Sequence, residues 1–241
     1  LDADPAALTP ADVSAWVGRL TEEYAPGTVA LFVAQLRMIL DFAGIEPNPA
    51  RHRSVKLPSR RSEEINPPSS AHLLAMLERL AERWRLPVAT LEQTAMRVGE
   101  LECLAWGDVD VVGCRFRLAA VSTKTRQARW VQLPEWLMDA IADSCPLEDR
   151  LAGRPVFGGF TRHAARMAMI RACKLAGIPQ YHPHDLRHRR TSLWHGQGIP
   201  VAELSKRVGH ASAKMTLDLY SHVMPLDELP TETLASLVRH G

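Results

Sequence analysis

The spacing of apolar residues constrains the fold of this chain more than any other feature of its sequence. Along most of the 241 residues, apolar side chains recur every three or four positions, which is the period of an amphipathic helix. Residues 109–121 and 128–133 instead alternate around a polar tip at 123–127, and this pattern predicts a β-hairpin. We therefore expect a mainly α fold with a small antiparallel β-sheet, an α+β class.

The expected helices have recognisable ends. Thr9 is an N-cap with proline at the next position, and Gly177 and Gly209 follow helical stretches that they would end. An apolar stripe at helical spacing consists of Val29, Phe32, Val33, Leu36, Ile39 and Leu40. Further helices are expected at about residues 70–80, 91–104, 160–177, 185–193, 201–208, 212–220 and 229–238.

A change of composition divides the chain. Residues 51–69 are first basic and then rich in proline and serine, which is typical of an extended linker. We place a helical N-terminal domain at 1–57, the linker at 58–69 and a larger domain with a C-terminal tail at 70–241. The chain begins at Leu1 rather than at methionine, so we expect a fragment whose first domain is truncated.

Composition excludes several classes of protein. The four cysteines form no C-x-x-C pair, which argues against a zinc ribbon or a disulfide framework and fits a reducing compartment. There is no signal peptide and no apolar run of transmembrane length. A net charge of +2 names no partner, but residues 154–190 carry eight Lys/Arg and one acid. Such a block is either a solvated face or a phosphate-binding surface.

Chemically useful residues gather between positions 184 and 222. His184-Asp-Leu-Arg187 is followed by Gly209-His210 and then by Tyr220. Arginine offers a planar fork of donors that matches phosphate, histidine moves protons near neutral pH, and an activated phenol is a nucleophile. Together these groups suggest attack on a phosphodiester by a tyrosine.

This ordered set resembles the signature of the tyrosine recombinase (phage integrase) family. Upstream, residues 94–100 read Thr-Ala-Met-Arg-Val-Gly-Glu, similar to the family's T-G-x-R-x-x-E with Ala95 in place of the usual glycine. Lys124 lies at the expected hairpin tip, where the family carries a lysine. The resemblance covers about residues 65–225. Each motif is weak alone, and all of them in order are specific.

The resemblance implies a helical N-terminal domain that clamps DNA and a catalytic domain that recombines DNA at specific sites, integrating or excising a mobile element. By this resemblance Arg97 and Arg187 bind the scissile phosphate, and His210 donates a hydrogen bond to one of its non-bridging oxygens. Lys124 acts as the general acid, His184 assists proton transfer, and Glu100 orients an arginine. Tyr220 forms a 3′-phosphotyrosyl link. No metal, ATP or other cofactor is implied.

The implied partners are double-stranded DNA, three further copies in a homotetramer on that DNA, and accessory DNA-bending or directionality proteins, with no membrane. The implied location is the cytoplasm or nucleoid of a bacterial host. Basic residues outside the catalytic set that are candidates for DNA contact are Arg60, Arg61, Arg126, Arg162, Arg166 and Lys174.

Three other interpretations use the same residues. Type IB topoisomerases share the tyrosine chemistry, so relaxation of DNA strands is the nearest alternative. A homologue that binds DNA without catalysis is the second, although the full catalytic set speaks against it. In the third, His184-Asp-Leu-Arg-His188 mimics the zinc motif H-E-x-x-H of metalloproteases, with aspartate one methylene shorter than the glutamate base.

Overall fold

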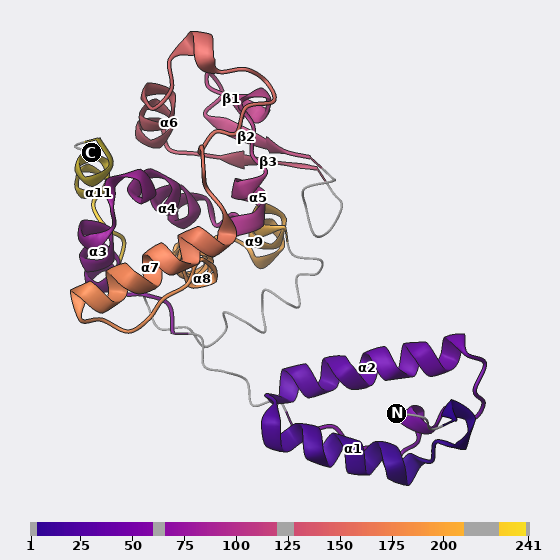
Figure 1. Cartoon of the computed structure of the whole chain (residues 1–241). Helices are drawn as coiled ribbons and strands as arrows, with labels where there is room; N and C mark the ends of the chain where they lie inside the picture. Colours follow the sequence, from indigo (N-terminus) through magenta and orange to yellow (C-terminus); the bar gives the residue numbers. More distant parts are fainter. Residues whose placement is uncertain (1–3, 60–65, 120–127, 210–226, 240–241) are drawn as a thin grey trace. The chain divides into compact units, whose positions relative to one another are not determined.

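The computed structural model describes residues 4–59, 66–119, 128–209 and 227–239. The chain divides into two compact units, 1–64 and 65–241, and each unit has its own hydrophobic cluster (Figure 1). No helix in the described ranges is both long and apolar enough to cross a bilayer. Each unit is described separately below.

Two helices, α1 (Pro10–Glu23) and α2 (Pro26–Phe42), form most of the N-terminal unit. Thr9 starts α1 as predicted: its hydroxyl accepts a hydrogen bond from the amide of Asp12 at 3.2 Å, and the carboxylate of Asp12 accepts one from the amide of Thr9 at 2.9 Å. This reciprocal pair satisfies two amides that the first helical turn leaves without partners.

The predicted apolar stripe of α2 is confirmed at most of its positions. Val29, Val33 and Leu40 are buried against α1, whereas Ile39 is 62% exposed and does not belong to the core. The basic run after α2 is also partly structural, because Arg51 pairs with Asp41 at 2.5 Å. The N-terminal unit therefore uses one of its cations to fix its own loop.

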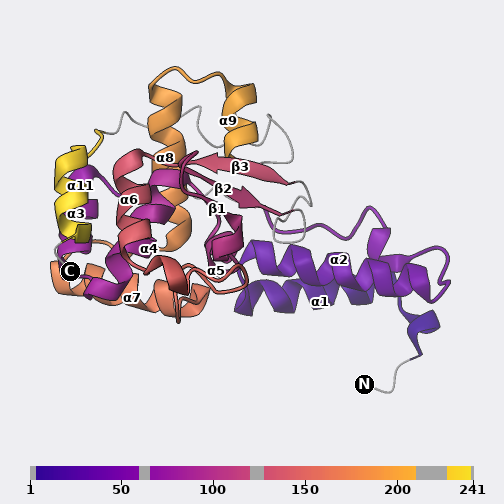
Figure 2. The ribbon, with the colours of Figure 1, turned by 90° about the horizontal axis from the view of Figure 1, so that it is seen from above.

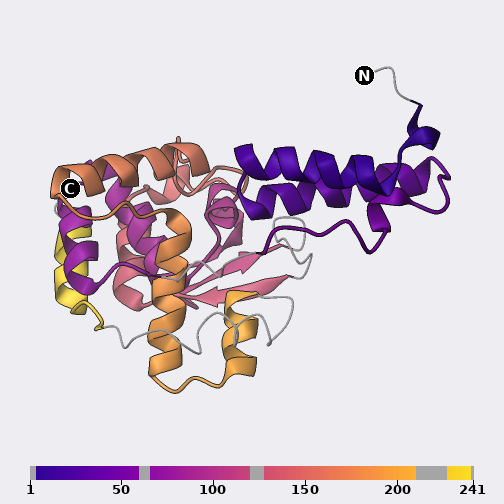
Figure 3. The ribbon, with the colours of Figure 1, turned by 90° about the horizontal axis from the view of Figure 1, so that it is seen from below.

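The C-terminal unit is built around α4, which contacts α6, α7, α8 and α11 (Figure 2). Figures 2 and 3 show α8 and α9 side by side, close to the end of the sheet. The described helices of this unit are α3 (Ser70–Arg79), α4 (Glu82–Thr94), α5 (Val98–Glu102), α6 (Glu135–Asp143), α7 (Arg162–Ala176), α8 (Pro183–Gly196), α9 (Val201–Val208) and α11 (Thr231–Arg239). Short 3₁₀ turns are η1 (Pro5–Ala7) and η2 (Pro49–Arg51) in the N-terminal unit, and η3 (Trp106–Asp108) and η4 (Leu147–Asp149) in the C-terminal unit.

A three-stranded antiparallel sheet in the order β1-β2-β3 supplies the small β component. Its strands are β1 (Val109–Asp110), β2 (Arg115–Leu118) and β3 (Arg129–Gln132). Phe116 pairs with Val131 and both are buried, while Trp130 on the opposite face is 49% exposed. The predicted first hairpin strand is thus two strands, because Cys114 turns the chain at a positive φ of 46°.

Two helical predictions in this unit need correction. The single helix expected at 91–104 is two helices, since α4 ends at Thr94 and α5 begins at Val98. Helix α6 is absent from the sequence-based expectation, although the buried residues Leu137 and Ile141 have helical spacing. In contrast, α9 covers the predicted residues, and α7 ends at Gly177 as predicted, with φ of 67°.

The C-terminal tail packs on its own unit. Helix α11 contacts α4 and α6, and Leu229 and Leu234 are buried at 8% and 2% exposure. The guanidinium of Arg85 on α4 also donates to the carbonyl oxygen of Leu237 at 3.4 Å. The amphipathic pattern of the tail is therefore satisfied within one chain.

Candidate active site

Arg97 lies at a break between two helices. Ala95 caps the C-terminus of α4 in the left-handed conformation, with φ of 52° and ψ of 23°, and two residues later Arg97 is the N-cap of α5. A left-handed residue after a helix is usually glycine, which has no Cβ to clash. The turn explains why the family motif prefers glycine at the position of Ala95, and it directs Arg97 out of the core with 23% of its side chain exposed.

Arg187 approaches the same turn from α8. Its side chain is buried, with 2% exposure, and its guanidinium donates to the carbonyl oxygen of Ala95 at 2.6 Å. A second donor of Arg187 reaches the carbonyl oxygen of Val208 at 2.5 Å. These contacts hold the planar group in one orientation between α4 and the end of α9.

The two arginines meet at the C-terminus of α9. Arg97 donates to the carbonyl oxygen of Gly209 at 2.7 Å, directly after the carbonyl of Val208 that Arg187 binds. Gly209 is left-handed, with φ of 67°, and a Cβ on it would lie 2.9 Å from Cζ of Arg129. The structure thus brings together Arg97 and Arg187, which lie far apart in the sequence, immediately before His210.

Glu100 is the carboxylate of this cluster. It is buried, and it accepts hydrogen bonds from Arg97 at 3.0 Å and from two nitrogens of Arg129 at 2.9 and 2.7 Å. Burial alone raises the pKa of Glu100, but hydrogen bonds and charge from Arg129 and Arg97 outweigh burial and hold the pKa below its ordinary value of 4.5. Glu100 is therefore a fixed anion that orients two guanidinium groups.

Arg129 was not among the residues singled out from the sequence. It begins β3 and lies on the same face of the strand as the buried Val131, and 12% of its side chain is exposed. An arginine at an inward position of an alternating strand requires a buried partner, so the alternation itself could have revealed it. The cluster thus combines three guanidinium groups, those of Arg97, Arg129 and Arg187, with one carboxylate, an excess of positive charge that favours binding of a further anion.

His184 lies one helical turn before Arg187 and is exposed. Its ring meets the ring of His188 edge to face, with centroids 4.5 Å apart. In the described part of the chain, no three His, Cys, Asp or Glu side chains are grouped so that they could hold a metal ion. The described geometry therefore gives no support to the metalloprotease interpretation of these two histidines.

Several predicted residues lie outside the described ranges, namely Lys124, His210, Tyr220, Arg60, Arg61 and Arg126. For some of them, the structure describes the residues directly next to them in the sequence. Strands β2 and β3 flank the segment that carries Lys124, and α9 with Gly209 leads directly to His210. The described framework therefore ends one residue before His210 and flanks the segment of Lys124 on both sides.

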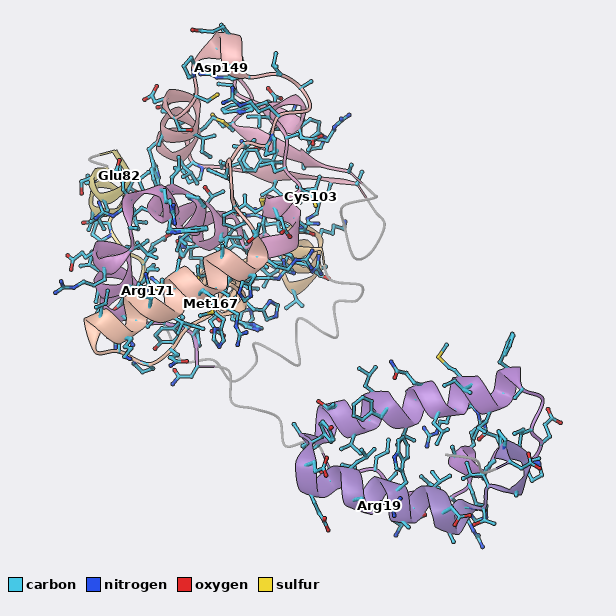
Figure 4. The ribbon with its side chains drawn as sticks, in the orientation of Figure 1. Arg19, Glu82, Cys103, Asp149, Met167 and Arg171 are labelled. Atoms are coloured by element: carbon cyan, nitrogen blue, oxygen red, sulfur yellow. The ribbon has the colours of Figure 1, made fainter. Side chains whose placement is uncertain are left out.

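The predicted DNA contacts on α7 differ among themselves. Arg166 and Lys174 are exposed, whereas Arg162 is already paired with Glu102 at 2.9 Å. Arg171 and the half-exposed Met167, labelled in Figure 4, belong to the same helix. Helix α7 thus presents Arg171 to solvent in addition to the cations that the sequence singled out.

Part of the basic block at 154–190 is buried. Arg189 and Arg190 on α8 are 0% and 4% exposed, and Arg190 pairs with the buried carboxylate of Glu92 at 2.9 Å. The carboxylate of Glu92 lies beside both of these arginines, so they form part of an interior ionic cluster and not of an outer basic face. Charge counts along a sequence cannot separate such interior ion pairs from an outer basic face.

The C-terminal unit is a mainly helical domain in which two arginines from separate elements contact the end of one helix. Such an arrangement defines a class of domain suited to holding a phosphodiester. Residues 65–226 match the profile of the phage integrase family, and the chain belongs to that family.

The relatives agree with this assignment. The chain is 31% identical over 246 residues to the prophage phiRv2 integrase of Mycobacterium tuberculosis, covering 92% of this chain and 64% of that integrase's length. It is 24% identical over 216 residues to the tyrosine recombinase XerA of Thermococcus kodakarensis, covering 83% and 72% of the two chains. The Tn1549 transposon integrase, solved in complex with transposon right end DNA, has the same fold, with a TM-score of 0.76, 18% identity and coverage of 92% and 84%.

Proposed function

We propose that this chain is the DNA-cleaving part of a site-specific recombinase that integrates or excises a mobile element through a 3′-phosphotyrosyl intermediate. The observation that carries the proposal is the meeting of Arg97 and Arg187 on the consecutive carbonyl groups of Val208 and Gly209. His210 follows directly in the sequence and Tyr220 lies ten positions further on. One short stretch of chain thus links a phosphate-binding pair to a nucleophile.

The proposed mechanism depends mainly on positioning and charge. Attack on a phosphodiester increases negative charge on the oxygens around phosphorus, and Arg97 and Arg187 stabilise it without losing their own protons. Glu100 and the carbonyl acceptors hold both guanidinium planes before DNA arrives, so little reorganisation is needed. His210 donates to a non-bridging oxygen.

The proton transfers involve the remaining residues. Tyr220 attacks phosphorus and forms the 3′ link, and its phenol loses a proton with help from His184 and the nearby cations. Lys124 protonates the leaving 5′ oxygen. Rejoining is the reverse reaction, in which a 5′ hydroxyl attacks the phosphotyrosine. These residues need no ATP, because the link conserves the energy of the broken bond, and no metal ion, because the arginines supply the positive charge.

The proposed partner is double-stranded DNA carrying attachment sites. Positive charge on α7, from Arg166, Arg171 and Lys174, would contact phosphates outside the active site. The N-terminal unit would clamp the duplex as a second DNA-binding domain. We further propose a homotetramer on two duplexes, assisted by DNA-bending or directionality proteins, in the cytoplasm of a bacterial host.

A covalent selection tests this function and does not require the sequence of the DNA site. A library of nicked duplexes with randomised sequence is incubated with the chain, and protein–DNA adducts are isolated under denaturing conditions and sequenced. We expect adducts on a restricted set of sequences, also in excess EDTA. Tyr220→Phe, which removes only the attacking oxygen, should bind the same duplexes and yield no adduct.

The outcomes separate the alternatives. Adducts on nearly every sequence, together with relaxation of supercoiled plasmid, would favour a topoisomerase. Sequence-specific binding with no adduct would favour the inactive homologue. Loss of adducts on chelation and their return with zinc would contradict the metal-independent mechanism.

A further inference from the structure

The chain directly after residue 226 is held by a group of side chains on α3, on α8 and at the C-cap of α8. Arg189 donates to the carbonyl oxygen of Asp227 at 2.8 Å, and the hydroxyl of Ser70 donates to the same oxygen. The carboxylate of Glu228 accepts hydrogen bonds from Arg190 and, at 3.0 Å, from Gln197. We call these four donors, together with residues 227–228, the tail anchor.

The tail anchor rests on a buried ion pair. Glu92 on α4 is 1% exposed, lies 3.5 Å from Nε of Arg189 and accepts from Arg190 at 2.9 and 3.1 Å. Arg190 also donates to the carbonyl oxygen of Glu92 at 3.1 Å. Glu228, in contrast, has 43% of its side chain exposed. Glu92 therefore balances one of the two positive charges in the core, and Glu228 at the rim supplies a second carboxylate and connects the tail to Arg190.

Such a cluster is a poor choice if its purpose is stability alone. Removing charges from water costs free energy that apolar packing avoids, and well-packed apolar replacements are often at least as stable. Charge-assisted hydrogen bonds instead fix direction as well as distance. The apolar contacts of Leu229 and Leu234 already attach the tail to the unit, so the ionic group adds a defined position for residues 227–228.

Helix α8 bears both the anchor and a proposed phosphate ligand. Arg187 precedes Arg190 by one helical turn, a rise of about 4.5 Å. Arg187 binds the carbonyl of Val208, where α9 ends, and Arg189 binds the carbonyl of Asp227. Val208 and Asp227, the described residues that bracket Tyr220 in the sequence, are thus both attached to one helix. A segment with both ends fixed samples fewer conformations than a segment with one fixed end.

We propose that Arg189, Arg190 and Gln197 are positioning residues, which hold Asp227 and Glu228 so that Tyr220 is presented to the phosphate bound by Arg97 and Arg187. This inference rests on the proposed function. It assigns the anchor no contact with DNA and no part in proton transfer. Its effect is on the probability that the phenol is in line with the scissile phosphate.

Glu228→Ala tests the anchor by removing its half-exposed carboxylate and leaving the buried one in place. The variant removes the rim contacts and leaves Arg190 paired with Glu92. The matched control is Glu232→Ala, which also removes one acid from the tail; Glu232 is exposed on α11 and makes no ion pair with any residue in the described ranges. The probe is a nicked duplex of a sequence recovered by the covalent selection, under single-turnover conditions.

We expect Glu228→Ala to slow adduct formation about tenfold or more, because displacing a reacting group by roughly 1 Å can cost a hundredfold in rate. Affinity for the nicked duplex should be unchanged, and the melting temperature should fall by no more than about 2–4 °C. Glu228→Gln, which keeps an oxygen for Arg190, should fall between Glu228→Ala and the unchanged chain. Glu232→Ala should cleave at the normal rate.

The results distinguish failure of the proposed function from failure of the anchor alone. If the unchanged chain forms no adduct with any duplex, the proposed function fails and the inference falls with it. If it forms adducts that Tyr220→Phe does not, while Glu228→Ala cleaves normally, only the anchor is refuted. A slower rate that accompanies weaker DNA binding, or a large fall in melting temperature, would make Glu228 a structural residue and overturn the inference.

Discussion

At Ala95 the backbone adopts a conformation that costs most residues free energy, yet the site depends on it. The left-handed turn places the carbonyl oxygen of Ala95 within hydrogen-bond distance of Arg187. It also separates α4 from Arg97, which lies two residues later. A non-glycine residue in this region loses roughly 1–2 kcal/mol through contact of its Cβ with the backbone. The alanine therefore retains the geometry of the family motif at some cost in stability.

The first prediction is that Ala95→Gly stabilises the C-terminal unit. Glycine removes the Cβ strain but adds backbone freedom to the unfolded chain, so the net gain should be about 0.5–1 kcal/mol. Ala89→Gly is the control, since Ala89 lies inside the same helix in the right-handed region, where glycine costs about 1 kcal/mol. Urea unfolding of both variants measures the difference, and destabilisation by Ala95→Gly would contradict the strain argument.

The second prediction concerns Glu100 and pH. Its pKa is lower in the folded chain than in the unfolded chain, so its ion pairs stabilise fully above the ordinary pKa of 4.5. That contribution is lost as the pH falls below 4.5 and through the folded pKa. In Glu100→Gln, the unfolding free energy should drop by roughly 1.5–3 kcal/mol at neutral pH and should fall less steeply below pH 4.5.

The matched control is Glu102→Gln. Glu102 pairs with Arg162, whose side chain is 70% exposed, so its loss should cost less than about 1 kcal/mol. Unfolding by urea at a series of pH values compares the two variants. If the unfolding free energy of Glu100→Gln falls just as steeply at acidic pH as that of the unchanged chain, other carboxylates govern the acid sensitivity.

Among the elements, the hairpin β2–β3 carries the one candidate residue expected to act on the leaving group. Its strands pair in register from Arg115 with Gln132 to Leu118 with Arg129, and Arg129 also holds Glu100. The same strand therefore fixes the arginine cluster and leads out of the segment that contains Lys124. Arg129 on β3 and Arg97 thus share Glu100 as a hydrogen-bond partner, which connects the hairpin to the arginine cluster.

The third prediction separates leaving-group catalysis from phosphate binding. Lys124→Ala should slow cleavage of ordinary DNA, and a 5′-bridging phosphorothiolate should restore most of the rate because a thiolate needs little protonation. Arg97→Ala should lose about 10²- to 10³-fold and gain nothing from the thiolate, since charge on the non-bridging oxygens is unchanged. Arg129 still pairs with Glu100 in that variant. Equal rescue of both variants would show that the roles are assigned wrongly.

The elements also show how far the sequence could predict the structure. Helix α9 and the end of α7 were predicted because glycine marks both C-termini. The break between α4 and α5 was missed, since alanine at position 95 favours a continuous helix and only its tertiary contact with Arg187 requires the turn. Contacts such as Arg129 with Glu100 depend on how β3 packs beside α5, which no local pattern specifies.

Within the candidate site, the sequence motifs singled out residues but did not specify their environments. Arg97, Glu100 and Arg187 were singled out from their motifs, and the structure brings all three together. The interior position of Arg189 and Arg190 could not be predicted, because a run of cations reads the same whether it faces solvent or a buried glutamate. The side chain of Glu92 lies in another helix, far away in the sequence.

At the scale of the whole molecule, the two units have separate cores of unequal size. The cluster in residues 1–64 contains few buried side chains, namely Val13, Val17, Val29, Val33, Leu40, Ala50 and Val55. The cluster in residues 65–241 is several times larger and includes the buried face of the sheet. A domain of about 60 residues buries a smaller fraction of its surface and is marginally stable, unlike one of about 150 or more.

The last prediction is therefore that the chain unfolds in two steps and that its catalytic unit stands alone. Calorimetry of the full chain should show an early transition for residues 1–64 and a later one for 65–241. The fragment 65–241 should melt at the temperature of the later transition and should still form the tyrosine adduct, because Arg97, Glu100, Arg129 and Arg187 all lie within it.

The same fragment should bind DNA more weakly, since it loses the basic run that includes Arg53 and Lys56 along with the N-terminal unit. Its affinity should also depend less steeply on salt, because fewer phosphates are neutralised. Gel shifts at several salt concentrations measure both quantities on the duplex recovered by covalent selection. A single cooperative transition in the full chain, or a fragment that cannot fold, would contradict the prediction that residues 65–241 fold independently of residues 1–64.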